Sequence, residues 1–304
     1  MTIAVLGPGG VGGLIAGALD RVGTLTLVIA REPTAELIAA RGLRVSSVRL
    51  GDFVAHPSAR ARLDEPVDAL IVATKASGLG DALERVAAPV GLVLPLLNGL
   101  DHLATLRERF GAETVLAGTI RVEADRPRPG VVVHSSRFLR IDMACAHPSA
   151  RPRMEALART LNEAEIPARV EESEAQVMWG KLVRLNALAC TTSAHDKLLG
   201  EILATPALRA ELEGAIAEGC AVAAAEGAQI PEADPLGELT AAHPTLGSSM
   251  QRDIAARRPP ELDAIPGAVL RAAARHGIAC PTIERLVGLI AERAGGDGVD
   301  DLRR

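Results

Sequence analysis

The feature that most constrains this chain is a glycine-rich turn that begins at Gly7. An apolar run, Thr2–Leu6, leads into Gly-Pro-Gly-Gly-Val-Gly-Gly at residues 7–13, and an apolar helical pattern follows at Val11–Val22. The spacing is GxGxxG between a strand and a helix, which is the context that gives this motif its meaning. A pyrophosphate would lie at the helix N-terminus, where unpaired N–H groups and the helix dipole favour negative charge. The pattern predicts a dinucleotide site, and a glycine-rich turn without a ligand is the alternative.

Each glycine of the motif has a separate expected task. Gly7 permits the tight turn, Gly9 lets the backbone approach a pyrophosphate, and Gly12 lets the helix pack close to the strand. Gly10 and Val11, at the helix N-terminus, complete the expected contacts with the cofactor.

Short apolar runs alternate with helical patterns through the first half of the chain. Continuous apolar runs bounded by turn residues are typical of strands buried on both faces of a parallel sheet. This rhythm predicts an N-terminal Rossmann-type, doubly wound domain over residues 1–172. We expect strands at Thr2–Leu6, Leu25–Ala30, Ala69–Thr74, Gly91–Leu96 and Thr114–Ala117, and an antiparallel extension formed by Val131–His134 and Phe138–Asp142.

Helical patterns dominate from about Ser173 onward. They predict an all-helical C-terminal domain over residues 173–304, for binding substrate and for dimerisation through its apolar helices. The polar, glycine-rich stretch at 295–304 is expected to be frayed. A length of 304 residues suits two domains.

Composition excludes several classes of protein. The chain has no tyrosine, so mechanisms that need a tyrosine acid are excluded. A net charge of −5 without a basic block argues against a nucleic-acid or anionic-membrane partner. The four cysteines are far apart, which argues against a zinc site or a disulfide framework and suits a reducing compartment. The same cysteine spacing leads us to expect no metal site. With no signal-peptide pattern and no long apolar run, we expect a cytoplasmic protein.

The end of the second strand bears on the choice of dinucleotide. Proteins that bind NAD usually have an acidic residue there, which binds the ribose hydroxyls. In this chain Arg31 occupies the place where a guanidinium can bind a 2′-phosphate, and Lys75 could add a second positive charge. Glu32 argues the other way, since a slip of one residue would make it the ribose ligand. These residues favour NADPH.

Two polar residues lie where chemistry could occur. Asn98, in Leu97-Asn98-Gly99-Leu100, follows a strand at its carboxyl end, where its amide could orient a neighbouring amine or carboxamide, although Asn-Gly is also an ordinary turn. Lys181 lies within an apolar helix, in a chain with 30 arginines and only three lysines. A lysine there either extends its amine to solvent or acts as a proton donor, because burial lowers the pKa of lysine toward neutrality.

Ser249 and Glu261 belong to a second polar segment. Gly247–Asp253 is typical of a capped helix start, and Glu261 falls in the first turn of the next helix. Serine caps and first-turn glutamates are ordinary structural features. Capping leaves a hydroxyl and a carboxylate free to face a substrate as well.

Taken together, these stretches resemble the ketopantoate reductase family (2-dehydropantoate 2-reductases). The resemblance implies a Rossmann domain, a helical domain and reduction of a 2-keto acid by NADPH, as in pantothenate biosynthesis. It implies that Lys181 is the general acid, that Asn98 lies near the nicotinamide and the lysine, that Ser249 binds the substrate carboxylate and that Glu261 accepts the distal hydroxyl. The matching segments are GPGGVGG at Gly7–Gly13, Lys75, LNGL at Leu97–Leu100, WGKL at Trp179–Leu182, SSMQRDIAARRPPELD at Ser248–Asp263 and HGIACP at His276–Pro281.

Two departures from the family pattern fall near the substrate. Many members have asparagine four residues after the lysine, where this chain has Leu185; Asn186 is five residues away and therefore off the lysine's face. The family often has Asn-Gly after the glutamate, whereas this chain has Pro266-Gly267. The reaction type is therefore better supported than ketopantoate as the substrate. A β-hydroxyacid dehydrogenase and a catalytically silent NADPH sensor or scaffold are the alternatives.

Overall fold

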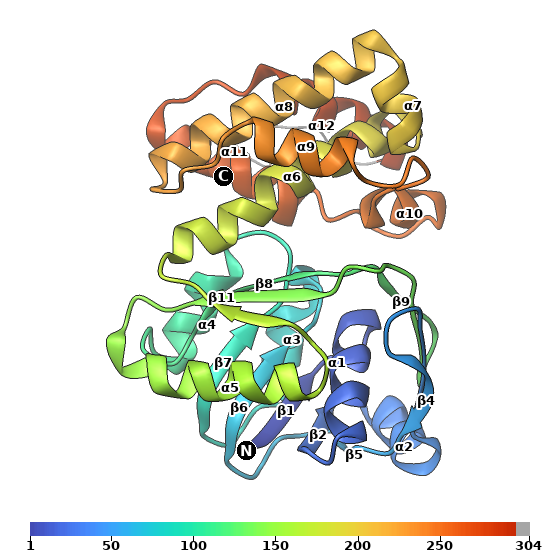
Figure 1. The fold of residues 1–304 in the computed structure, drawn as a ribbon, viewed down its shortest axis with the longest axis vertical. Helices are drawn as coiled ribbons and strands as arrows, with labels where there is room; N and C mark the ends of the chain where they lie inside the picture. The colour runs from blue at the N-terminus through green and yellow to red at the C-terminus, as the bar shows by residue number, and fades with distance from the viewer. Residues whose placement is uncertain (296–304) are drawn as a thin grey trace. The chain divides into compact units, whose positions relative to one another are not determined.

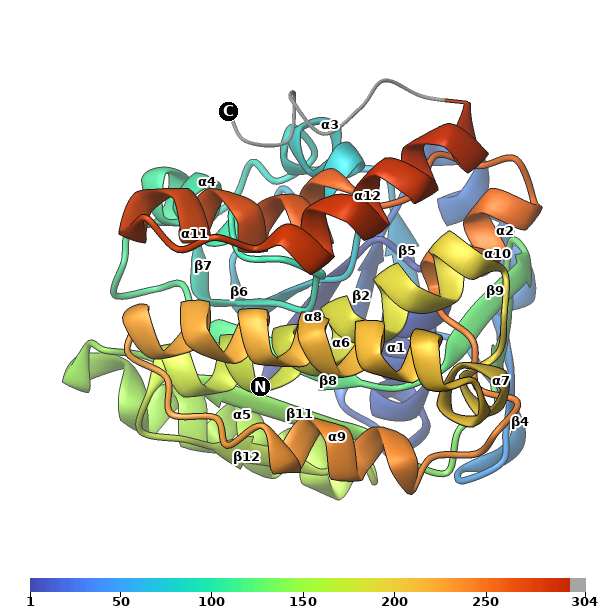
Figure 2. The same ribbon diagram turned by 90° about the horizontal axis from the view of Figure 1, so that it is seen from above.

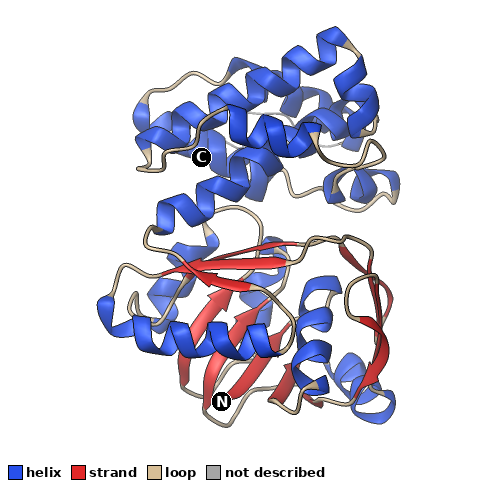
Figure 3. Cartoon of the chain, viewed as in Figure 1, coloured by secondary structure: helices blue, strands red, loops and turns tan. Residues whose placement is uncertain are grey.

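The structure is a computed structural model and describes residues 1–295. The fraying expected for the tail concerns residues 296–304, which lie outside the described residues. By internal contacts the chain forms two compact units. The first unit contains Met1–Leu97 and His102–Val177, and the second contains Asn98–Asp101 and the chain from Met178 onward. The division into domains at residues 172 and 173 stays a prediction. All the described strands belong to the first unit (Figures 1 and 3).

A five-stranded sheet forms the centre of the first unit, in the order β5-β2-β1-β6-β7. Every pairing in it is parallel. Alternate residues of each strand enter two separate cores, so that Ile3 and Val5 face one side of the sheet and Ala4 and Leu6 face the other. Helices cover both faces, as the continuous apolar runs require. The Rossmann-type fold and the helical C-terminal region predicted from the sequence are therefore confirmed.

The elements of the first unit are as follows. The strands are β1 (Thr2–Leu6), β2 (Leu25–Ile29), β3 (Leu43–Ser47), β4 (Gly51–Ala55), β5 (Ser58–Arg60), β6 (Val67–Val72), β7 (Val90–Pro95), β8 (Ala117–Arg121), β9 (Ala124–Arg128), β10 (Val131–His134), β11 (Arg140–Ala144) and β12 (Ala168–Val170). The helices are α1 (Gly10–Arg21), α2 (Glu32–Arg41), α3 (Leu79–Leu83), α4 (His102–Phe110) and α5 (Arg151–Glu163), with short 3-10 turns at Ala76–Gly78 and Pro148–Ala150.

The prediction that Val131–His134 and Phe138–Asp142 form an antiparallel extension of the parallel sheet is wrong, because both segments belong to other sheets. β10 pairs in parallel with β3 and antiparallel with β9, whereas β11 pairs with β8 and β12 in a third sheet. β3, β4, β5 and β9 were not predicted, because none of them carries a continuous apolar run like those of the predicted strands. The strand expected at Thr114–Ala117 lies later in the chain, as β8.

Helices make up the second unit. Its elements are α6 (Glu174–His195), whose first residues belong to the first unit, α7 (Leu199–Ala204), α8 (Pro206–Ala225), α9 (Ala233–Thr240), α10 (Ser249–Ala255), a π-helical turn at Asp263–Gly267, α11 (Ala268–His276) and α12 (Pro281–Ala294). α8 packs against both α11 and α12 (Figure 2). Among residues 1–295, no helix is both long and apolar enough to cross a membrane.

Pro266 explains the π-helical turn. Proline has no N–H group, so it cannot donate to the carbonyl of Leu262 in the ordinary helical pattern. Gly267 donates to that carbonyl instead, at 2.9 Å, and the step of five residues defines a π turn. The departure from the family's Asn-Gly therefore has a structural consequence directly after Glu261.

Candidate functional site

The glycine-rich turn joins β1 to α1 in the first unit. Gly7 has a φ of +91°, in the region that favours glycine. A Cβ at Gly10 would collide with the carbonyl oxygen of Ala124, and one at Gly12 would collide with the carbonyl oxygen of Gly7. A Cβ at Gly9 would meet no heavy atom within 4 Å. The turn is thus closely packed on the protein side and open at Gly9.

Arg31 and Lys75 follow the two strands that flank β1. Arg31 is the N-cap of α2, directly beyond the end of β2, and Lys75 follows β6 at the start of the Ala76–Gly78 turn. Because all three strands are parallel, both residues lie at the same sheet edge as the glycine-rich turn. Both are exposed, and so is Glu32, in the first turn of α2.

Lys181, Asn98 and Glu261 form a hydrogen-bonded chain within the second unit. The Lys181 Nζ donates to Asn98 Oδ1 at 2.8 Å, and Asn98 Nδ2 donates to Glu261 Oε2 at 3.1 Å. Lys181, on α6, is only 9% exposed, and the other two side chains are half-buried. The amine is therefore bound by Asn98 Oδ1 at the end of a side chain that is nearly buried. The asparagine amide joins a cationic group to an anionic one and fixes the orientation of both.

The short segment 98–101 packs with the second unit through its backbone and through Asp101. Gly99 has a φ of +86°, and its Cα lies so close to the carbonyl oxygen of Ala264 that a Cβ would collide with it. Arg271 donates to Asp101 Oδ2 at 2.6 Å and to Asp263 Oδ1 at 2.7 Å. The guanidinium thus ties the Asn98 segment to the π-helical turn that follows Glu261.

Ser249 is exposed as the first residue of α10, whereas its neighbour Ser248 is the buried N-cap. The Ser248 hydroxyl accepts from the Gln251 N–H at 3.0 Å and from the Thr192 hydroxyl at 2.9 Å. Capping is therefore performed by Ser248, which leaves the Ser249 hydroxyl free for another role.

Asn186 is fully buried, on another face of α6 from Lys181. Its Oδ1 accepts from the Cys190 thiol at 3.4 Å, and its Nδ2 is unpaired within residues 1–295. Burial raises the pKa of Cys190 to about 12. Leu185, four residues after the lysine, is half-buried. No polar side chain of α6 therefore occupies the position next to Lys181 that the family pattern expects.

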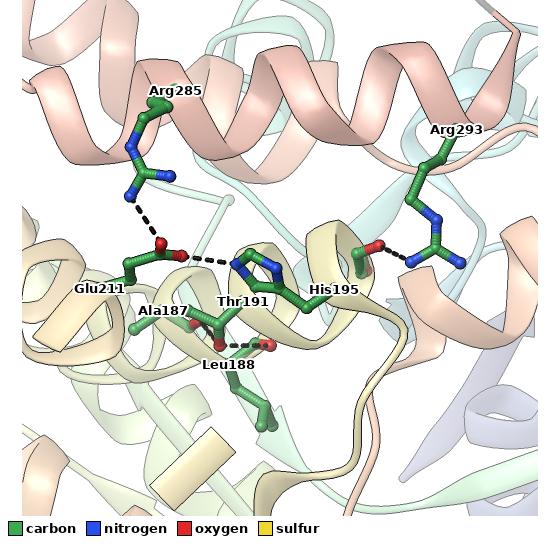
Figure 4. A network of polar contacts seen from close by, with 8 residues as sticks. Ala187, Leu188, Thr191, His195, Glu211, Arg285 and Arg293 are labelled. Carbon is green, nitrogen blue, oxygen red and sulfur yellow. Dashed lines mark hydrogen bonds and ion pairs between the residues drawn. The ribbon is translucent and has the colours of Figure 1, made fainter. Parts of the chain in front are cut away.

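The end of α6 is held in place by polar contacts with α8 and α12 (Figure 4). His195 Nε2 lies 2.6 Å from Glu211 Oε2 of α8, and Arg285 of α12 contacts the other oxygen of Glu211 at 3.0 Å. Arg293, also of α12, pairs with Asp196 at 2.9 Å. These contacts fix the helix that carries Lys181 relative to its neighbours in the second unit.

Sequence reasoning missed Arg271 and Asp101. Asp101 directly follows the LNGL segment, but an aspartate after a turn is too common to be informative. Arg271 is one of 30 arginines, and nothing in the pattern distinguishes it from the others.

The parallel sheet with flanking helices, followed by a helical unit, defines a Rossmann-type two-part architecture. Residues 3–146 match the family described as ketopantoate reductase PanE/ApbA, and residues 175–294 match its C-terminal family. The chain therefore belongs to the ketopantoate reductase family and is an oxidoreductase of that family.

Relatives match over nearly the whole chain. An uncharacterised oxidoreductase, YkpB, from Bacillus subtilis is 30% identical, over 93% of this chain and 96% of its own. A 2-dehydropantoate 2-reductase from Halobacterium salinarum is 29% identical, over 97% of this chain and 100% of its own.

Solved structures show the same fold. A 2-dehydropantoate 2-reductase from Geobacter metallireducens has a TM-score of 0.88 at 28% identity, covering 96% of this chain and 99% of its own. A D-mandelate dehydrogenase solved with NADH and anilino(oxo)acetate also has a TM-score of 0.88, at 21% identity, covering 97% of this chain and 98% of its own. The second likeness concerns the fold alone.

Proposed function

We propose that this protein reduces ketopantoate, or a closely related 2-keto acid, to the 2-hydroxy acid with NADPH. The observation that carries the proposal is the Lys181–Asn98–Glu261 chain, which holds a nearly buried ammonium group in one orientation. Such a group can stabilise negative charge that develops on a carbonyl oxygen and can supply the proton to it.

The glycine-rich turn suits a dinucleotide. The open space at Gly9 leaves room for a pyrophosphate beside the N-terminus of α1, where unpaired N–H groups favour negative charge. Gly7, Gly10, Val11 and Gly12 would shape this turn. Arg31 and Lys75, at the same sheet edge, would bind a 2′-phosphate and favour NADPH over NADH, and Asn98 would contact the nicotinamide.

The protein's own groups would guide the proton. When bound, the nicotinamide supplies a hydride to C2 of the keto acid. Lys181 would donate a proton from Nζ to the oxygen on C2 and become a neutral amine, which solvent then reprotonates. Asn98 Oδ1 would keep Nζ aimed during this transfer.

Two further groups would fix the substrate. The exposed Ser249 hydroxyl would donate to the substrate carboxylate, and Glu261 would accept from a distal hydroxyl of the substrate. Leu185 and Pro266 replace polar residues expected near this position, so related 2-keto acids belong in the test.

The decisive experiment follows the loss of nicotinamide absorbance with ketopantoate, in parallel with NADPH and NADH. Turnover with ketopantoate that is faster with NADPH supports the whole proposal. A panel of other branched, hydroxylated or aromatic 2-keto acids identifies the substrate if ketopantoate is inert. NADPH binding without turnover on any keto acid would contradict the proposal and favour a silent sensor.

A further inference from the structure

A hollow with two arginines lies in the first unit, apart from the residues discussed so far. Its volume is about 380 Å³, and it is lined by Val48, Arg49, Ser135 and Arg137. All four residues are exposed. No carboxylate is among the lining residues, so the fixed charge of the hollow is positive.

The hollow lies where two parallel strands end. β3 and β10 pair in parallel, and their last residues, Ser47 and His134, are partners in the register. Val48 N donates to the carbonyl oxygen of His134 at 3.1 Å, just beyond both ends. The segments that carry Arg49 and Arg137 therefore leave the sheet at the same edge.

A buried hydrogen-bond chain holds these two segments together. The Ser47 hydroxyl lies 2.8 Å from His134 Nδ1, and the Ser136 hydroxyl lies 3.3 Å from His134 Nε2. The Ser136 hydroxyl also donates to the carbonyl oxygen of Phe138 at 2.8 Å. Ser47, His134 and Ser136 are each at most 6% exposed. Buried hydrogen bonds thus fix the backbone segments that line the hollow.

The two guanidinium groups of the hollow are unpaired in the part of the chain that the structure describes. Within residues 1–295, the guanidinium groups of Arg49 and Arg137 make no ion pair and no hydrogen bond. Many other arginines of the chain are paired with carboxylates, such as Arg107 with Glu174 at 2.7 Å. The charge of Arg49 also reaches the buried core, where it contributes to a lowered pKa of His134 that is due mainly to burial.

From this geometry we propose that the hollow binds a phosphate monoester, with its dianionic head between Arg49 and Arg137. A guanidinium presents a planar fork of donors that matches phosphate oxygens, and two such groups balance a dianion. The Ser135 hydroxyl adds a neutral donor. Val48 supplies an apolar wall for the organic part of the ester.

The hollow shares no lining residue with the glycine-rich turn, Gly7–Gly13, that is proposed for the dinucleotide. The turn follows β1 of the five-stranded sheet, whereas the hollow follows β3 and β10 of the separate four-stranded sheet. The proposal therefore does not depend on the proposed reductase activity.

Calorimetric titration of the full chain with phenyl phosphate and with inorganic phosphate tests the proposal. The protein is kept saturated with NADPH, so that the glycine-rich turn does not contribute. We expect phenyl phosphate to bind and the double variant R49Q/R137Q to weaken binding by at least about tenfold, because both charged contacts are lost. The matched control R159Q removes an exposed arginine of α5 and should leave binding unchanged.

The arms of the titration separate the sources of binding. Phenyl phosphate that binds more tightly than inorganic phosphate assigns the site to an ester, and V48S should remove this difference in affinity. Equal affinity for the two ligands would restrict the site to free phosphate and contradict the proposal of an ester. Benzoate that binds as tightly would contradict the preference for a dianion. Absence of binding to the wild-type protein, or equal binding by the double variant, would overturn the site. Repeating the comparison without NADPH keeps the result interpretable if the cofactor proposal itself fails.

Discussion

The glycine-rich turn and the Lys181 site are built in opposite ways. The turn is one continuous stretch whose shape depends on the backbone, with Gly7 at positive φ and Gly12 against a carbonyl oxygen. The Lys181 site consists of side chains from three segments, with Lys181 and Asn98 separated by 83 positions in the sequence and Asn98 and Glu261 by 163. A local backbone motif can therefore be recognised in sequence, whereas a dispersed side-chain site depends on tertiary structure.

The largest effect is expected at the centre of the dispersed site. Replacing Lys181 with alanine removes the proposed proton donor, and turnover should fall by about 10²- to 10⁴-fold, the usual contribution of a general acid. NADPH binding should persist, because the glycine-rich turn belongs to the other unit. Stopped-flow turnover and a fluorescence titration with NADPH measure the two quantities separately.

Lys181→Arg is the matched control, because it keeps the positive charge but cannot release a proton near neutral pH. It should be nearly as inactive as the alanine variant. Full activity in either variant would show that Lys181 is not the proton donor.

The glycines of the turn give the next largest effect. Gly12→Ala places a Cβ against the carbonyl oxygen of Gly7, so it should destabilise the first unit by about 1–3 kcal/mol, as overpacking does. Gly9→Ala meets no protein atom, so it should leave stability within about 0.5 kcal/mol of the wild type.

NADPH affinity distinguishes these two variants further. Gly9→Ala should weaken NADPH binding by about tenfold or more, because its Cβ enters the space proposed for the pyrophosphate. Urea unfolding and a cofactor titration test the pair. Gly80→Ala on α3 is the control, which should leave NADPH affinity unchanged and raise stability by up to about 1 kcal/mol, because alanine favours a helix over glycine. Normal NADPH affinity in Gly9→Ala would exclude a pyrophosphate at this turn.

The same contrast explains what could be predicted from the sequence. The buried parallel strands were predicted because each is a continuous apolar run, and the Gly7–Gly13 turn because its spacing is local. β3 and β4 were not predicted, since one face of the sheet is exposed and residues such as Arg44 and Ser46 interrupt the continuous apolar run by which the other strands were recognised. The pairing of β10 with β3 spans about 90 residues, and no local pattern encodes it.

At the candidate site, the residue types and the nearness of Asn98 to Lys181 could be predicted from the resemblance, but the contact of Asn98 with Glu261 could not. The resemblance supplied Lys181, Asn98, Ser249 and Glu261. That Asn98 bridges the other two charged groups follows only from the packing of segment 98–101 with the second unit. Arg271 produces no sequence signal, because its role depends on two aspartates that tertiary structure brings together.

Arg271 therefore provides a smaller but sharper test of the dispersed site. Arg271→Gln releases Asp101 and Asp263, which should loosen the segment that carries Asn98 and lower kcat by about tenfold, because small displacements at a catalytic group are costly. The KM for NADPH should stay unchanged. Arg271→Lys should restore part of kcat by keeping one ion pair.

The matched control is Arg275→Gln, which removes an exposed arginine on α11 that pairs with Glu226 at 3.0 Å. It should leave kcat within a factor of about two, since exposed ion pairs contribute little. An unchanged kcat in Arg271→Gln would mean that the backbone at Gly99 positions Asn98 without help.

The smallest expected effect concerns pH and the first unit. Burial lowers the pKa of His134 below its ordinary value of 6.5, so the folded protein keeps this imidazole neutral. As the pH falls below about 6.5, the unfolded chain binds a proton that the folded chain does not, and stability decreases by up to about 1.4 kcal/mol per pH unit. Hydrogen exchange corrected for intrinsic rates should therefore accelerate in β3 and β10 between pH 7 and pH 5, but not in α12 of the second unit. His134→Gln should flatten this dependence, whereas replacing the exposed His243 should not. Equal acceleration of exchange in both units would show that the loss of stability at low pH is global. His134 would then not be the group that makes the first unit more sensitive to pH than the second.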